Sequence, residues 1–89
     1  MPIFQGAVTV TDAPTRLDLW PANGAGTPAI RNMDSSVIVY VGNSGVTTSN
    51  GFPVKPDEVF SPDLRNYDGG VYGIVASGTV ACRVFQVGG

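Results

Sequence analysis

The side chains that most often perform catalysis are scarce in this sequence. It contains no histidine, the most common general base and a frequent metal ligand. Its single cysteine, Cys82, lies among apolar residues with no histidine to activate it, so we expect a buried, inert thiol rather than a nucleophile. One cysteine also excludes an internal disulfide and a thiolate metal cluster. No serine stands in the Gly-x-Ser-x-Gly pattern of many hydrolases.

The remaining polar residues do not form a recognisable binding motif either. A group of carboxylates lies between Pro53 and Gly70, and it comprises Asp57, Glu58, Asp63 and Asp68. Their spacing is not that of an EF-hand, so a solvated acidic loop is favoured over a calcium site. The glycine-rich residues 42–45 are followed by neither a lysine nor a helix, as a phosphate-binding loop would require. We therefore expect no enzymatic activity, no metal and no cofactor.

Size and composition predict one small domain with an interface. The 89 residues make a single domain, 1–89, which should bury only about 63% of its unfolded surface. The chain is 43% hydrophobic but only 13% charged, about half of the usual charged share of roughly 25%. Few charges leave much neutral or apolar surface, which is typical of a protein that binds a partner or itself.

Charge and hydropathy argue against nucleic acid and membranes as partners. The net charge is −2, and the five cations are scattered over the sequence: Arg16, Arg31, Lys55, Arg65 and Arg83. Nucleic-acid binding needs a clustered basic face, so no nucleic acid is expected. No apolar run approaches the length of a membrane span, and residues 1–4 lack the basic start of a signal peptide. We expect synthesis in a reducing cytoplasm.

The segment Val37–Gly42 is the strongest predicted strand. Val37, Val39 and Val41 alternate with Ile38 and Tyr40, so one set faces each side of the strand. Because both sets are apolar, both faces should be covered, either by another sheet or by a neighbouring subunit.

A second strong pattern lies near the C-terminus. Val71–Ala76 and Thr79–Val87 flank Ser77-Gly78, which predicts a hairpin with a two-residue loop. In the register that opposes apolar or small residues, Tyr72 lies beside Arg83, and a cation–π contact is expected.

Shorter signals complete an all-β prediction. Further strands are expected at Ile3–Val10, Arg16–Trp20, Ala29–Asn32 and Val59–Ser61, with Leu17 facing the core. Asn50-Gly51 suits a type I′ turn, and the prolines of residues 53–58 predict a loop. No helical periodicity is present. The fold class is all-β: a small β-sandwich or partly open barrel of about six to eight short antiparallel strands with no significant helix.

From Val37 to Val87 the chain resembles small proteins encoded among the head genes of tailed bacteriophages. The motifs that carry this resemblance are Tyr40-Val41-Gly42, Val46-Thr47-Thr48-Ser49-Asn50-Gly51, Pro53-Val54-Lys55-Pro56-Asp57-Glu58, Val71-Tyr72-Gly73-Ile74-Val75-Ala76-Ser77-Gly78-Thr79-Val80 and Arg83-Val84. They are strand and turn signatures without chemistry of their own. The family pattern has a glycine where this chain has Asp57, and Gly-Gly or Gly-Ser where it has Gly42-Asn43.

The resemblance implies a virion structural protein and, within this class, a capsid decoration (cement) protein. The expected partners are the major capsid protein and further copies of the chain, arranged as a homotrimer because capsids offer threefold positions. The expected location is the capsid surface, after synthesis in the host cytoplasm. Apolar and aromatic positions give the candidate interface: Phe4, Trp20, Ile38, Tyr40, Phe52, Tyr72 and Arg83. The alternative function is a carbohydrate- or receptor-binding module of a phage tail or spike.

Overall fold

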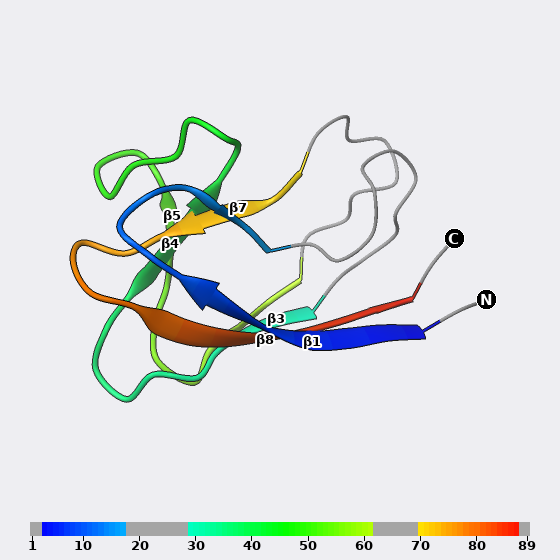
Figure 1. Ribbon diagram of the computed structural model, residues 1–89. Coiled ribbons are helices and arrows are strands. Elements are labelled where there is room, and N and C mark those ends of the chain that lie inside the picture. Colours follow the sequence, from blue (N-terminus) through cyan, green and yellow to red (C-terminus); the bar gives the residue numbers. More distant parts are fainter. Residues whose placement is uncertain (1–2, 18–28, 62–69, 88–89) are drawn as a thin grey trace.

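The chain folds into two antiparallel β-sheets that pack face to face (Figure 1). The computed structural model describes residues 3–17, 29–61 and 70–87. Within these ranges there are eight strands and no helix. The all-β sandwich predicted from the alternating patterns is therefore confirmed.

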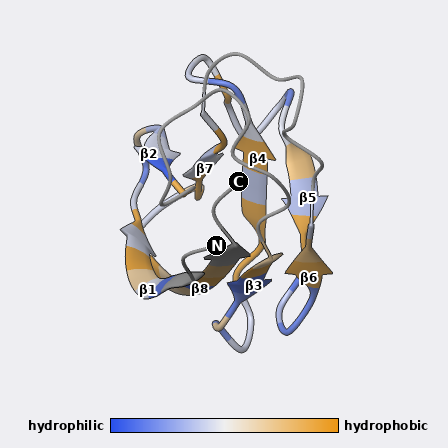
Figure 2. Ribbon diagram, turned by 90° about the vertical axis from the view of Figure 1, so that its right-hand side faces the viewer, coloured by the Kyte–Doolittle hydropathy of each residue, from blue (hydrophilic) through white to orange (hydrophobic). Residues whose placement is uncertain are grey.

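Each sheet has four strands, and we name the sheets A and B. Sheet A has the order β1 (Ile3–Val10), β8 (Val80–Val87), β3 (Ala29–Asn32), β6 (Val59–Phe60). Sheet B has the order β2 (Thr15–Arg16), β7 (Tyr72–Ile74), β4 (Val39–Gly42), β5 (Phe52–Val54). Figure 2 shows the two sheets as two rows, with β2 over β1 at one side and β5 over β6 at the other.

The core lies between the sheets and is built mostly from β-branched residues. Period-2 alternation sends every second side chain of a strand inward, and β8 in this way contributes Val80, Cys82 and Val84. Other core residues, such as Leu17, lie just beyond the end of a strand. The buried cluster comprises Val10, Leu17, Ile30, Val39, Val41, Val54, Val71, Val75, Val80, Cys82 and Val84. The predicted burial of Leu17 and Cys82 is confirmed, with exposed fractions of 0% and 1%.

The predicted C-terminal hairpin is wrong. Strand β7 pairs with β2 and β4, whereas β8 pairs with β1 and β3, so residues 75–79 carry the chain from sheet B to sheet A. Val75 and Val80, at the two ends of this connection, are both buried in the core. Alternation identifies the apolar face of each strand, but strands that pair within a sheet and strands that stack across a core show the same alternation.

This topology also removes the predicted contact between Tyr72 and Arg83. Gly73 faces the core, because a Cβ there would lie 2.9 Å from Cδ1 of Leu17. Its neighbour Tyr72 therefore points outward from sheet B, while Arg83 is exposed on the outer face of sheet A. The two side chains lie on opposite faces of the molecule.

The second apolar face of β4 is covered in part by the chain itself. The loop of residues 43–51 folds back over sheet B and buries Val46, which is 3% exposed. A Cβ at Gly51 would lie 2.6 Å from Cβ of Tyr40 and 2.9 Å from Cγ2 of Val46. Ile38 and Tyr40 are left half-buried. A neighbouring subunit is thus not the sole source of cover for this face.

Gly51 does not form the predicted type I′ turn. Its φ is not positive, and its N–H donates to the carbonyl of Thr47 at 2.9 Å, one residue further back than in a β-turn. The Oδ1 atom of Asn50 accepts from the N–H of Thr47 at 2.7 Å, which closes the loop. Glycine is needed at this position because the backbone passes close to Tyr40, not because the turn requires a left-handed residue.

The edges of the sandwich agree with the positions of the prolines. Pro53, predicted to lie in a loop, belongs to β5, an edge strand that pairs only with β4 among the described residues. Proline is tolerated at an edge because no ladder hydrogen bond is needed on the outer side. The strands predicted at Ile3–Val10 and Ala29–Asn32 are confirmed, and the edge strand predicted at Val59–Ser61 is found at Val59–Phe60. Of the strand predicted at Arg16–Trp20, residues 18–20 lie outside the described residues.

Candidate functional site

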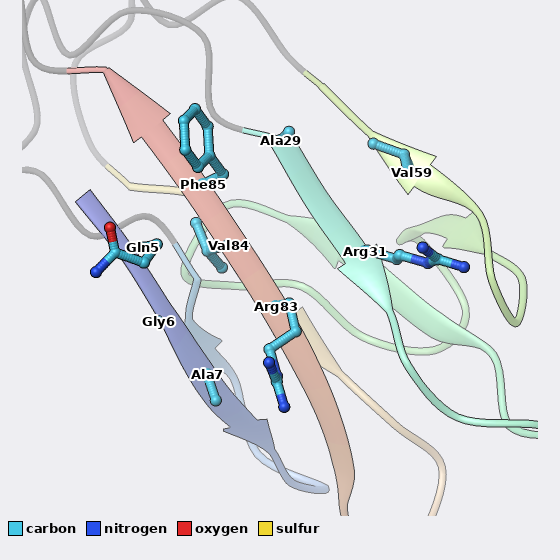
Figure 3. Close-up of a pocket in the computed structure, with 9 residues that line it drawn as sticks. All are labelled: Gln5, Gly6, Ala7, Ala29, Arg31, Val59, Arg83, Val84 and Phe85. Carbon is cyan, nitrogen blue, oxygen red and sulfur yellow. The ribbon is translucent and has the colours of Figure 1, made fainter. Parts of the chain in front are cut away.

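The outer face of sheet A carries an open hollow of about 360 Å³ (Figure 3). All four strands of the sheet contribute to it. Its lining comprises Gln5, Gly6, Ala7, Ala29, Arg31, Val59, Arg83, Val84 and Phe85. We name the exposed part of this lining the sheet A face.

The hollow exists because small residues alternate with large ones across the strands. Phe85 lies between Gln5 of β1 and Ala29 of β3, which are its partners in the two ladders. One step along β8, Arg83 lies between Ala7 and Arg31. The two alanines leave space that the side chains of Phe85 and Arg83 only partly fill, as Figure 3 shows.

Two large apolar side chains are exposed on this face. Phe85 is 50% exposed and Val59 is 59% exposed. Isolated exposed apolar residues are common, but here they border the same hollow, and the domain has few charges to surround them. Clustered apolar exposure of this kind is typical of a surface that binds a partner.

The face also places two arginines directly opposite each other. Arg31 and Arg83 are cross-strand partners, an arrangement in which like charges repel. Figure 3 shows the two side chains extending away from each other, Arg31 towards β6 and Arg83 towards β1. Nη2 of Arg31 lies 3.4 Å from Oδ1 of Asp57, an exposed ion pair. For Arg83, no carboxylate of the described residues lies within ion-pair distance.

A buried polar side chain positions β3 beneath this face. Asn32 is fully buried, and its Nδ2 donates to the carbonyls of Val37 and Val54 at 2.8 and 2.9 Å. Its Oδ1 accepts from the N–H of Asp34 at 2.9 Å, so every polar atom of the amide is used. The side chain thereby joins β3 of sheet A to β5 of sheet B.

The turn after β3 is held by a carboxylate. Oδ2 of Asp34 accepts from the N–H groups of Ser36 and Val37, at 2.8 and 2.7 Å. These backbone hydrogen bonds, that of Ser36 first, hold the pKa of Asp34 below its usual value. Sequence reasoning missed both Asn32 and Asp34. The available signal was the alternation of Ala29–Asn32, which places Asn32 on the same inward face as Ile30.

The candidate interface residues do not form one surface. Tyr40 and Tyr72 lie on the outer side of sheet B, with Ile38 just before β4, whereas Phe52 lies at the β5 edge and is 62% exposed. The Phe52 ring packs on Phe60 of β6, with ring centroids 5.6 Å apart.

Of the predicted residues whose side chains the structure describes, Arg83 alone lines the hollow. Phe4 belongs to β1, opposite Gln86, and its side chain lies outside the described part of the structure, as does the whole of Trp20. Phe85, Val59 and Arg31 were not predicted as site residues, because the pattern of residues 71–87 indicated a hairpin, whereas β8 is a central strand of sheet A.

The described residues contain neither a cluster of metal-ligating side chains nor a membrane-spanning helix. No group of three histidine, cysteine, aspartate or glutamate side chains comes together in the ranges 3–17, 29–61 and 70–87. In those same ranges there is no helix long and apolar enough to cross a membrane.

Comparison with known proteins gives no relatives. No protein-family model, no curated protein sequence and no solved structure matches this chain.

Proposed function

We propose that this chain is a non-enzymatic structural protein of a tailed bacteriophage that binds the outside of the capsid and stabilises the head. The observation that carries the proposal is the sheet A face, an apolar hollow on a rigid sheet of a domain with few charges. A decoration protein needs such a docking surface and needs no catalytic group. Many copies bound to one shell convert a weak contact into stable attachment.

The resemblance to phage head proteins supports the same function. Its motifs coincide with positions that determine the fold: Tyr40-Val41-Gly42 forms most of β4, Pro53 and Val54 belong to β5, and residues 55–58 form the connection to β6. Asp57, where the family pattern has glycine, has a φ of 65°. Glycine is favoured in this left-handed region, and aspartate is among the few residues that tolerate it. The departure from the family pattern is therefore compatible with the same turn.

The proposed partners are the major capsid protein and further copies of this chain, as a homotrimer on the virion surface. The sheet A face is the proposed contact with the capsid. The half-buried Ile38 and Tyr40, on the opposite side of the sandwich, remain available for contact between copies.

The test is binding to heads of the phage that encodes this chain, purified from a strain in which its gene is deleted. We expect the protein to sediment with these heads and to raise the temperature at which they release DNA. Phe85→Ser should weaken binding, since it removes the largest exposed apolar group of the hollow, whereas Phe52→Ser, at the β5 edge, should not. The Phe52 variant is a matched control for the loss of an exposed ring.

Absence of binding to these heads would overturn the proposal. Retention on a resin that carries host surface polysaccharide, without binding to heads, would instead favour the carbohydrate- or receptor-binding alternative.

A further inference from the structure

We propose that the sheet A face binds a carboxylate side chain of a partner protein, presented by an extended segment in which apolar residues flank the acid. Arg83 binds the carboxylate, and Phe85 and Val59 contact the flanking apolar side chains. The identification of the partner as a capsid subunit rests on the function proposed above, but the chemistry of the ligand does not.

The charge arrangement selects an anionic ligand. Arg31 and Arg83 repel each other across the ladder, and the described part of the chain provides a carboxylate, that of Asp57, only for Arg31. A carboxylate bound to Arg83 would supply the missing counter-charge and relieve the repulsion. The planar guanidinium group suits this role, because it donates two parallel hydrogen bonds to one carboxylate.

The apolar residues select a protein segment rather than a free anion. The hollow, at about 360 Å³, has the size of a small ligand site and is larger than one carboxylate needs. Its walls are Phe85 on one side and Val59 on the other, both half exposed or more. Covering these side chains stabilises the complex when the ligand brings apolar groups of its own, because apolar surface on both partners then leaves water.

The acidic groups at the rim disfavour a polyanion such as nucleic acid. Asp57 is 74% exposed and already pairs with Arg31, and Glu58 follows it in the connection to β6. The whole chain carries a net charge of −2. One arginine without a counter-charge therefore matches a single negative charge, whereas a phosphate backbone needs several clustered cations.

The test uses two peptides, acetyl-Leu-Glu-Leu-amide and acetyl-Leu-Gln-Leu-amide, titrated into ¹⁵N-labelled protein and followed by NMR. The glutamate peptide should shift the amide signals of Ala7, Ala29, Val59 and Phe85, and bind roughly fivefold more tightly than the glutamine peptide. Arg83→Gln should abolish this preference, because the charge that distinguishes the peptides is lost. Lys55→Gln removes the same charge from an exposed position outside the hollow and should preserve the preference.

Equal affinity of the two peptides, or shifts that map to another surface, would overturn the proposal. Shifts of the same signals with protein concentration alone would assign the face to a second copy of the chain and would also overturn it.

The capsid assay separates this inference from the proposed function. If wild-type protein and Arg83→Gln bind heads equally well, the carboxylate site is wrong but capsid binding stands. If the peptides bind as expected but the protein does not bind to phage heads, the carboxylate site stands and the proposed function is wrong.

Discussion

At the residue scale, Asn32 shows how one polar side chain organises a small sandwich. It lies inside the core, where an unpaired amide would be costly, yet its amide atoms find three backbone partners on other segments. These partners belong to the turn after β3, to the start of the segment that leads into β4, and to β5. The amide therefore specifies how β3, the following turn and β5 lie relative to one another.

Asn32→Ala should lower the free energy of unfolding by about 2–4 kcal/mol, because it removes three hydrogen bonds and leaves two carbonyls in or near the core without this partner. Urea denaturation followed by fluorescence measures the change. Asn43→Ala is the matched control, since its Oδ1 accepts the N–H of Gly45 in an exposed turn, and it should cost less than about 1 kcal/mol. Similar losses for the two variants would contradict the role given to Asn32.

Cys82 gives the protein a specific sensitivity to alkaline pH. Burial raises the pKa of its thiol from 9.0 to about 11. Between these two values the unfolded chain releases a proton that the folded chain keeps, so the free energy of unfolding falls as the pH rises. The slope is at most about 1.4 kcal/mol per pH unit from this group.

Denaturation of the wild type and of Cys82→Ala at several pH values from about 8 to 11 measures this contribution, because all other titrating groups are common to both proteins. The variant should show a shallower decrease in stability. The thiol of the native wild type should also resist thiol reagents until the protein is denatured. Parallel pH curves, or fast labelling of the native protein, would show that the thiol is accessible.

At the scale of the elements, the loop of residues 43–51 depends on a glycine at its end. Gly51→Ala should destabilise the protein by about 1–3 kcal/mol, because the added methyl would lie within 3 Å of Tyr40, Thr47 and Val46. Gly45→Ala in the same loop is the control, since its Cβ would meet only Oδ1 of Asn43, at 3.4 Å, and little change is expected. Thermal unfolding distinguishes them. Equal melting temperatures would mean that the loop does not pack on β4 as described.

The second prediction at this scale concerns the connection between β7 and β8, which joins the two sheets. Because Tyr72 and Arg83 lie on opposite faces, a double-mutant cycle with Tyr72→Ala and Arg83→Ala should give a coupling energy within about 0.5 kcal/mol of zero. Chemical denaturation of the four proteins gives this value. A coupling energy of about 1 kcal/mol or more would contradict this topology and support the hairpin that the sequence pattern predicted.

At the scale of the whole molecule, both outer faces of the sandwich retain apolar groups. The sheet A face exposes Phe85 and Val59, and the face of sheet B leaves Ile38 and Tyr40 half-buried even with the loop of residues 43–51 over it. The two faces point in opposite directions. A protein that binds a shell on one side and its own copies elsewhere needs such separate surfaces.

We expect a homotrimer, with a mass in sedimentation equilibrium of three times the 9.2 kDa of one chain. A domain of this size buries little surface alone and gains stability by association, and the trimer is proposed because capsids offer threefold positions. Tyr72→Glu, on the outer side of sheet B, should shift the equilibrium towards monomer, whereas Arg83→Gln should not. A stable monomer at high micromolar concentration would reject the trimer.

The sequence by itself determined the all-β class and the places of several strands, although the segment of β5 was assigned to a loop. Alternation depends only on the period of the β-backbone, so Leu17 could be assigned to the core, and Cys82 to a buried position, without knowledge of their neighbours in space. The absence of histidine and the low charge content follow from composition alone. Both are reasons why we propose a binding protein rather than an enzyme.

Only the tertiary structure decided which strands pair. Val75 and Val80 satisfy the same alternation whether their strands share a sheet or stack across the core, and the stacking arrangement is the one observed. The choice depends on contacts with β1, β3 and β4, which lie far away in the sequence. The candidate site follows from that choice, because Arg31, Arg83 and Phe85 meet only when β8 lies between β1 and β3.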